Sequence, residues 1–168
     1  DYPFHPERSD FLDVWLLANC DLCISTGSGL DAISDVYRRP ILFLNYLSLN
    51  NMVSWSNSIN YPKHLKWSDS DNFLTLEEHL EHGYGNTKDY EEAGIGVIDL
   101  TSDEITSVVQ ECWARLEDTF METDDDTNQQ NQFWKTMRES TLFKKQHDFI
   151  HPKARLASTF LRNNPNFL

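Results

Sequence analysis

The chain has 168 residues, 39% of them hydrophobic and 12% aromatic, which is enough length and apolar content to bury a core of its own. Its formal net charge of -13 argues against a nucleic-acid partner or an anionic membrane surface, because both repel a strongly acidic protein. No apolar run is long enough to span a bilayer.

The first half of the chain alternates predicted helices and strands. Ser9 can cap a helix whose apolar stripe runs to Ala18. Residues 22–25, LCIS, form a short continuous apolar run, which is typical of a strand covered on both faces. A helix is predicted at 30–38 and a second buried strand at 41–45. Short links in this order predict parallel strands joined by crossover helices.

Residues 46–71 are rich in Asn and Ser and have weak periodicity, so we predict a loop there. Two capping boxes follow, Thr75 with Glu78 and Thr101 with Glu104, and each predicts the start of a helix.

Toward the end of the chain, the acidic residues 124–126 are interpreted as an exposed break. Helices are predicted at 131–139 and at about 153–161. The whole pattern predicts one α/β domain over 1–168, a Rossmann-like three-layer structure with a parallel sheet and extra C-terminal helices.

The three cysteines of the chain are Cys20, Cys23 and Cys112. An odd number in an acidic chain is typical of a reducing compartment, so we predict a cytoplasmic protein. A redox C-x-x-C normally lies at a helix N-terminus, whereas Cys20 ends a predicted helix and Cys23 falls inside a predicted strand. We interpret the pair as small buried side chains and expect no metal.

The turn between the first strand and the next helix is the strongest candidate for a site. It consists of Ser25, Thr26, Gly27, Ser28 and Gly29, and we call residues 25–29 the glycine turn. In open parallel sheets, ligands bind outside the carboxyl ends of the strands. Glycines allow close approach of a ligand, and the amides of the turn and of the following helix can bind an anion. A phosphate or diphosphate is the ligand that fits this pattern.

The spacing alone leaves two interpretations of the glycine turn open. A Walker A loop needs a lysine that this stretch lacks, and GSGLDA lacks the last glycine of the dinucleotide fingerprint. The same residues could form only a tight connection. Asp31 could bind a sugar hydroxyl or interact with the helix dipole alone, and Asn45 ends the second strand at the same sheet edge.

Further candidates for ligand contacts lie outside the turn. His5 and Arg8, before the first helix, could meet a donor ligand or be part of a solvated loop. Lys63 belongs to a local basic cluster that could contact phosphate or be an ordinary surface charge. Asp69 and Asp71 form a D-x-D, the pair that some enzymes use for a divalent cation, but no strand is predicted before it, and we expect no metal site.

One family resemblance rests on the stretch SDFLDVWLLANCDLCISTGSGLDAISDVYRRPILFLNY, with support from LTLEEHL, YEEAGIGVIDLTSDEI and FLRNNPNFL. These segments resemble the nucleotide-sugar-binding half of GT-B glycosyltransferases. The similarity is to a bacterial group distantly similar to fucosyltransferase-like and heptosyltransferase-like enzymes. It covers most of the chain, and STGSGL is its most specific part.

The resemblance implies that the glycine turn binds the diphosphate of a nucleotide-diphosphate sugar, without a metal or other cofactor. It also implies a preceding Rossmann-like domain that binds the acceptor and supplies the catalytic base. We therefore expect the chain to be the C-terminal half of a longer protein, and to lack transferase activity by itself. Two alternatives stay open: a non-catalytic nucleotide- or phosphate-binding module, and a structural α/β domain.

Overall fold

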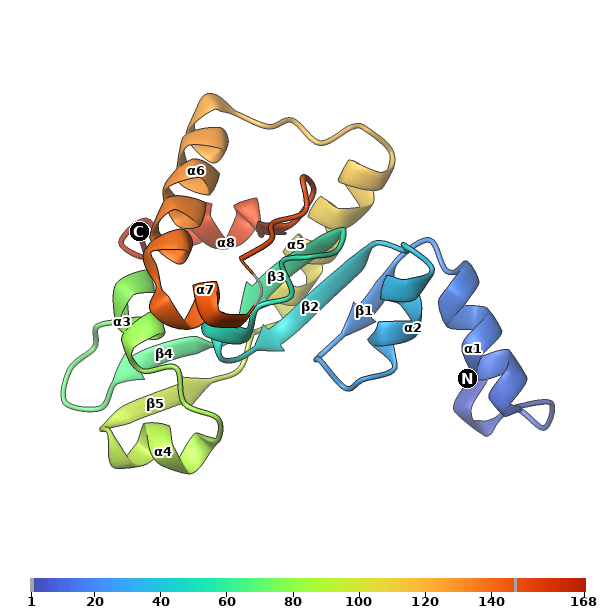
Figure 1. Ribbon diagram of the computed structural model, residues 1–168, viewed down its shortest axis with the longest axis horizontal. Helices are drawn as coiled ribbons and strands as arrows, with labels where there is room; N and C mark the ends of the chain where they lie inside the picture. The colour runs from blue at the N-terminus through green and yellow to red at the C-terminus, as the bar shows by residue number, and fades with distance from the viewer. Residues whose placement is uncertain (1, 147) are drawn as a thin grey trace.

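A four-stranded sheet lies at the centre of the computed structural model, which describes residues 2–146 and 148–168 (Figure 1). Its strands, in spatial order, are β1 (Cys23–Ser25), β2 (Ile41–Tyr46), β3 (Ser58–Pro62) and β6 (Arg155–Leu156). All three neighbouring pairs are parallel. The predicted Rossmann-like α/β class is confirmed.

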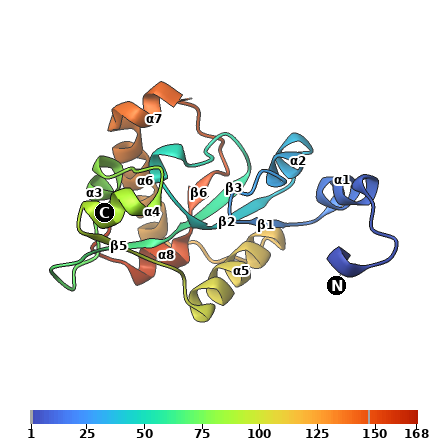
Figure 2. The same ribbon diagram turned by 90° about the horizontal axis from the view of Figure 1, so that it is seen from below.

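Helices cover both faces of this sheet (Figure 2). On one side lie α2 (Asp31–Val36) and α7 (Thr141–Gln146), and on the other lie α5 (Ser102–Leu116) and α8 (Ser158–Asn163). The main core joins the sheet to α5, α7 and α8 and to α6 (Asp124–Glu139).

The four strands are not equally buried. Residues 41–44 of β2 are all buried, as expected for a central parallel strand. In β1, by contrast, Ile24 is 50% exposed, because β1 is the edge strand of the sheet. The prediction of a strand covered on both faces is therefore right for β2 and wrong for β1.

Helix α1 (Asp10–Asn19) begins as predicted, since the Leu12 amide donates a hydrogen bond to Ser9 Oγ. Its apolar stripe, however, is largely in solvent. Phe11 is 73% exposed and Trp15 50%, and Ala18 is the buried residue of the helix.

The loop predicted at 46–71 is wrong. It contains η2 (Leu49–Asn51), β3 and β4 (His64–Trp67). β4 pairs antiparallel with β5 (Ile95–Ile98) in a second, two-stranded sheet, on which α4 (Thr87–Glu92) packs. The η1 turn (Tyr2–Phe4) precedes α1 at the start of the described chain.

The capping boxes at Thr75 and Thr101 are both formed, at the start of α3 (Leu76–Glu81) and of α5. The predicted break at 124–126 is wrong, because these residues are the first turn of α6, where carboxylates interact favourably with the helix dipole. The predicted helix at 153–161 is wrong at its start, where the chain forms β6 before α8 begins. Among the described helices, none combines the length and apolar composition that a membrane crossing needs.

Candidate functional site

The glycine turn leaves the sheet at the carboxyl end of β1, where the parallel α/β pattern predicts a ligand site. Gly27 and Gly29 have φ values of 80° and 92°, a region that other residues rarely adopt. A Cβ on Gly29 would meet no atom within 4 Å, and residues 26–29 are all exposed. The turn is thus shaped by its glycines and is accessible from solvent.

Three of the predicted residues are joined by hydrogen bonds within the turn. Ser25 Oγ donates to Asp31 Oδ2 at 2.6 Å and accepts from the Gly27 amide at 3.0 Å. Asp31 is only 9% exposed. The Ser25 hydroxyl and the Gly27 amide are therefore engaged inside the protein, and a buried carboxylate lies beside the turn.

The remaining amides of the turn define what it can bind. Within the described part of the chain, the amides of Ser28 and Gly29 have no hydrogen-bond partner, whereas those of Ala32 and Ile33 donate to Gly29 and Leu30. Helix α2 has only six residues. Any anion would consequently be held by turn amides and the hydroxyls of Thr26 and Ser28, with little help from a helix dipole.

Tyr46, which the sequence did not single out, packs against the turn. A Cβ on Gly27 would lie 3.3 Å from the Tyr46 ring. Burial raises the pKa of Tyr46, and the nearby charge of Asp31 raises it further. The aromatic ring at the end of β2 therefore leaves little room for a side chain at position 27. This contact depends on strand register, which the local sequence does not reveal.

The structure brings Lys63 to the same sheet edge, where its amide donates to the Tyr46 carbonyl. Its ammonium group, however, is 2.5 Å from Asp99 Oδ1. Asn45 also has a partner, since its Oδ1 accepts from the Leu100 amide at 2.9 Å. A ligand at this edge would have to compete with Asp99 for Lys63 and with Leu100 for Asn45.

His5 and Arg8 form contacts of their own at the start of the chain. His5 Nδ1 accepts from the Glu7 amide, and Arg8 Nη2 lies 3.4 Å from Asp13 Oδ2 on α1. None of the hydrogen bonds found among residues 2–146 and 148–168 joins either side chain to the glycine turn. The D-x-D is likewise used locally, because Asp71 pairs with Lys66.

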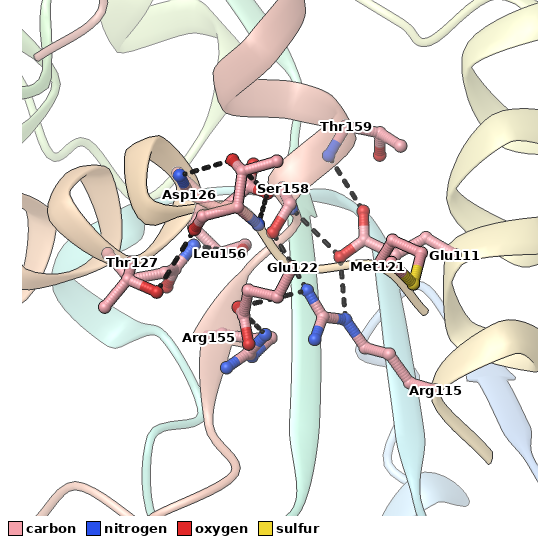
Figure 3. A network of polar contacts seen from close by, with 12 residues as sticks. Glu111, Arg115, Met121, Glu122, Asp126, Thr127, Arg155, Leu156, Ser158 and Thr159 are labelled. Atoms are coloured by element: carbon pink, nitrogen blue, oxygen red, sulfur yellow. Dashed lines mark hydrogen bonds and ion pairs between the residues drawn. The ribbon is translucent and has the colours of Figure 1, made fainter. Parts of the chain in front are cut away.

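After β6, the other edge strand of the sheet, the first amides of α8 are occupied by a carboxylate of the protein itself, which the sequence did not predict (Figure 3). The fully buried carboxylate of Glu111 accepts hydrogen bonds from the amides of Ser158 and Thr159 at the start of α8. Arg115 donates to the same carboxylate and to Ser158 Oγ, and it also lies 3.5 Å from Glu122. Glu111 and Arg115 are four residues apart on a helix, and this spacing alone could have predicted the ion pair from the sequence. Their contact with α8 could not be predicted, because it depends on tertiary packing.

Comparisons of the chain with protein-family models, with curated proteins and with solved structures found no match.

Proposed function

We propose that this chain is the donor-binding domain of a GT-B-like glycosyltransferase and that the glycine turn binds the diphosphate of a nucleotide-diphosphate sugar. The observation that supports this proposal most directly is the free pair of amides at Ser28 and Gly29, at the carboxyl end of a parallel strand. Successive free amides in a turn that contains glycines form a concave anion site.

Hydroxyls complete the proposed phosphate site. Thr26 and Ser28 are exposed on the same turn and can donate to phosphate oxygens. Lys63 lies at the same edge and can exchange Asp99, which is 72% exposed, for a ligand phosphate. Because an exposed ion pair stabilises a protein by at most about 1 kcal/mol, this exchange costs little.

Such a site would stabilise the negative charge of the departing nucleotide diphosphate. Backbone N–H groups that already point at the phosphate need no reorganisation when the glycosidic bond breaks, and they stabilise the negative charge that develops there. We assign no catalytic base to this chain, since the resemblance implies that a preceding domain supplies it.

The test is a pair of matched glycine variants titrated with UDP and GDP by calorimetry. Gly29→Ala places a Cβ on a residue at φ 92°, and Gly94→Ala does so at φ 74°, after α4; in both, the Cβ meets no atom within 4 Å. Each variant should lose about 1–2 kcal/mol of stability through backbone strain. We expect Gly29→Ala alone to weaken nucleotide binding, by about tenfold or more.

Two results would count against the proposal. Equal nucleotide affinity in both variants would move the binding site away from the turn, and no saturable heat in the parent protein would favour the structural α/β domain. A non-catalytic nucleotide-binding module would show the same binding. The native gene separates the two, since a Rossmann-like domain encoded upstream of Asp1 would favour the transferase.

A further inference from the structure

A cavity of about 520 Å³ lies between β4, α3, α8 and the residues that follow α8. This volume is in the range of small-molecule sites. Its lining comes from residues 64–79 and 160–167, which are distinct from the glycine turn. Aromatic rings and amide side chains dominate this lining, among them Trp67, Phe160, Phe167, Asn163, Asn164 and Asn166.

His79 is a buried polar residue of this cavity with an unsatisfied ring nitrogen. The residue is 3% exposed, and its Nδ1 has no hydrogen-bond partner. Burial lowers the pKa of His79 to about 3, with a smaller contribution from His64, so the ring is neutral at physiological pH. A buried nitrogen without a partner is rare in native proteins, and here the residue that carries it lines a cavity large enough to hold a partner.

His64, on the same cavity wall, is held rigidly. Its Nε2 lies 2.5 Å from Glu104 Oε1, and its ring stacks on Phe160 with centroids 5.9 Å apart. Burial raises the pKa of Glu104, but hydrogen bonds from Thr101 and His64 outweigh this effect and lower it overall. The carboxylate therefore stays charged and fixes Nε2, which leaves Nδ1 of His64 for a ligand.

Trp67 forms a fixed aromatic wall. Its indole Nε1 donates to Glu78 at 3.3 Å, and His82 packs edge-on against its ring at 5.4 Å. Glu78 is itself held, because it accepts from the Thr75 amide at 2.8 Å. A ring oriented in advance binds at a low entropic cost.

The charges of the lining select the class of ligand. The carboxylates of Asp71 and Glu78 line the cavity, and its described lining contains no lysine or arginine. An anion such as phosphate would be repelled. A quaternary ammonium ion could meet the aromatic faces, but it has no group that can hydrogen-bond to His79 Nδ1. A neutral ring with several hydroxyls can use both the aromatic faces and the polar groups.

We propose that this cavity binds a neutral, polyhydroxylated ring compound, with His79 Nδ1 and the Asn163 amide as hydrogen-bonding contacts and Trp67 as the stacking surface. The proposal rests on the cavity alone and does not depend on nucleotide binding at the glycine turn.

The experiment is a titration of the protein with methyl α-D-glucopyranoside, methyl α-D-galactopyranoside and myo-inositol, followed by the histidine ring signals in NMR spectra. We expect saturable binding of at least one probe with shifts of the His64 and His79 signals. His79→Leu, and separately Asn163→Ala on the exposed rim, should each weaken that binding by about five- to tenfold. The matched control is His151→Leu, which lies outside the cavity lining and should bind as the parent does.

Three outcomes would overturn the proposal. These are the absence of saturable binding for all three probes, binding that neither His79→Leu nor Asn163→Ala weakens, and binding of choline in their place. Asn163→Ala keeps the test valid if His79→Leu fails to fold, because Asn163 is exposed. Added UDP reports on the glycine turn and should leave the probe affinity unchanged.

Discussion

Asp31 is the residue whose charge most directly affects the proposed nucleotide site. Its carboxylate is buried beside the glycine turn and accepts a hydrogen bond from Ser25. A diphosphate bound to the turn amides would be repelled by this charge. The charge of this residue should therefore weaken the binding of a diphosphate at the turn.

We predict that Asp31→Asn tightens the binding of UDP by about three- to tenfold, on the order of 1 kcal/mol. The amide oxygen can still accept from Ser25, so the turn should keep its shape. Calorimetry with UDP measures the change. Asp35→Asn, on the same helix but near its other end, is the control and should have little effect. An unchanged or weaker affinity of Asp31→Asn would argue against a phosphate at this turn.

At the scale of single elements, α6 shows how a capping residue can also join two helices. Asp126 completes the capping box with Thr123 at the start of α6, and Arg162 of α8 donates to both of its carboxylate oxygens. The hydrogen bond from Arg162 is the main reason why the pKa of Asp126 lies well below its usual range, despite the opposite effect of burial.

This depressed pKa predicts a specific loss of stability in acid. The folded-state pKa of Asp126 lies below the unfolded-state value of about 4, so its contribution is fully present above about pH 4 and is lost as the pH falls toward the folded-state value. Asp126→Asn should therefore flatten the decline of the free energy of unfolding between about pH 5 and pH 3, measured by urea titration. Asp125→Asn, exposed in the same turn, should keep the slope of the parent, and equal slopes in all three proteins would contradict the assignment.

Two of the helix starts that were predicted correctly share a local signal. Thr75 with Glu78 and Thr101 with Glu104 match the Thr-x-x-Glu pattern, in which both partners lie within one turn of helix. The third box, Thr123 with Asp126, uses Asp in place of Glu, and it was hidden in an acidic run that reads as a break.

The elements that were missed depend on distant partners. β3 ends at Pro62 and β4 begins at His64, so that only Lys63 separates them. The Asn- and Ser-rich sequence around these strands suggests a loop. Both strands form because β2 and β5, which lie elsewhere in the chain, pair with them. The position of the glycine turn could be predicted for the opposite reason, since strand, turn and helix follow one another directly in the sequence.

The backbone of the candidate site could be predicted from the sequence, whereas the side chains that surround it could not. Gly27 and Gly29 have positive φ values, which glycine adopts readily in a turn. The contacts of Tyr46 with Gly27 and of Asp99 with Lys63 follow from strand register and tertiary packing, which span long stretches of sequence.

At the scale of the whole molecule, the net charge of -13 should make stability depend on salt. Like charges repel in the compact state, and added ions screen this repulsion. The attractive pairs exposed to solvent, such as Lys88 with Glu92, contribute little that salt could remove. The Glu111–Arg115 pair is buried and is screened much less.

We therefore expect the free energy of unfolding at neutral pH to rise by roughly 0.5–1 kcal/mol between about 0.02 and 0.5 M NaCl. Urea titrations at each salt concentration measure the change. Near the pI of about 4.7, where the net charge is small, the same salt series should have little effect. A fall in stability with salt at neutral pH would mean that attractive pairs outweigh the overall repulsion.

Glu111 makes the two edge strands of the parallel sheet, β1 and β6, differ. At β6, the protein uses one of its own side chains as a permanent counter-ion for the first amides of α8. Because this carboxylate is attached to the neighbouring helix, its effective concentration at these amides is high. The first amides of α8 are therefore already engaged, whereas the amides of Ser28 and Gly29 after β1 have no hydrogen-bond partner among the described residues.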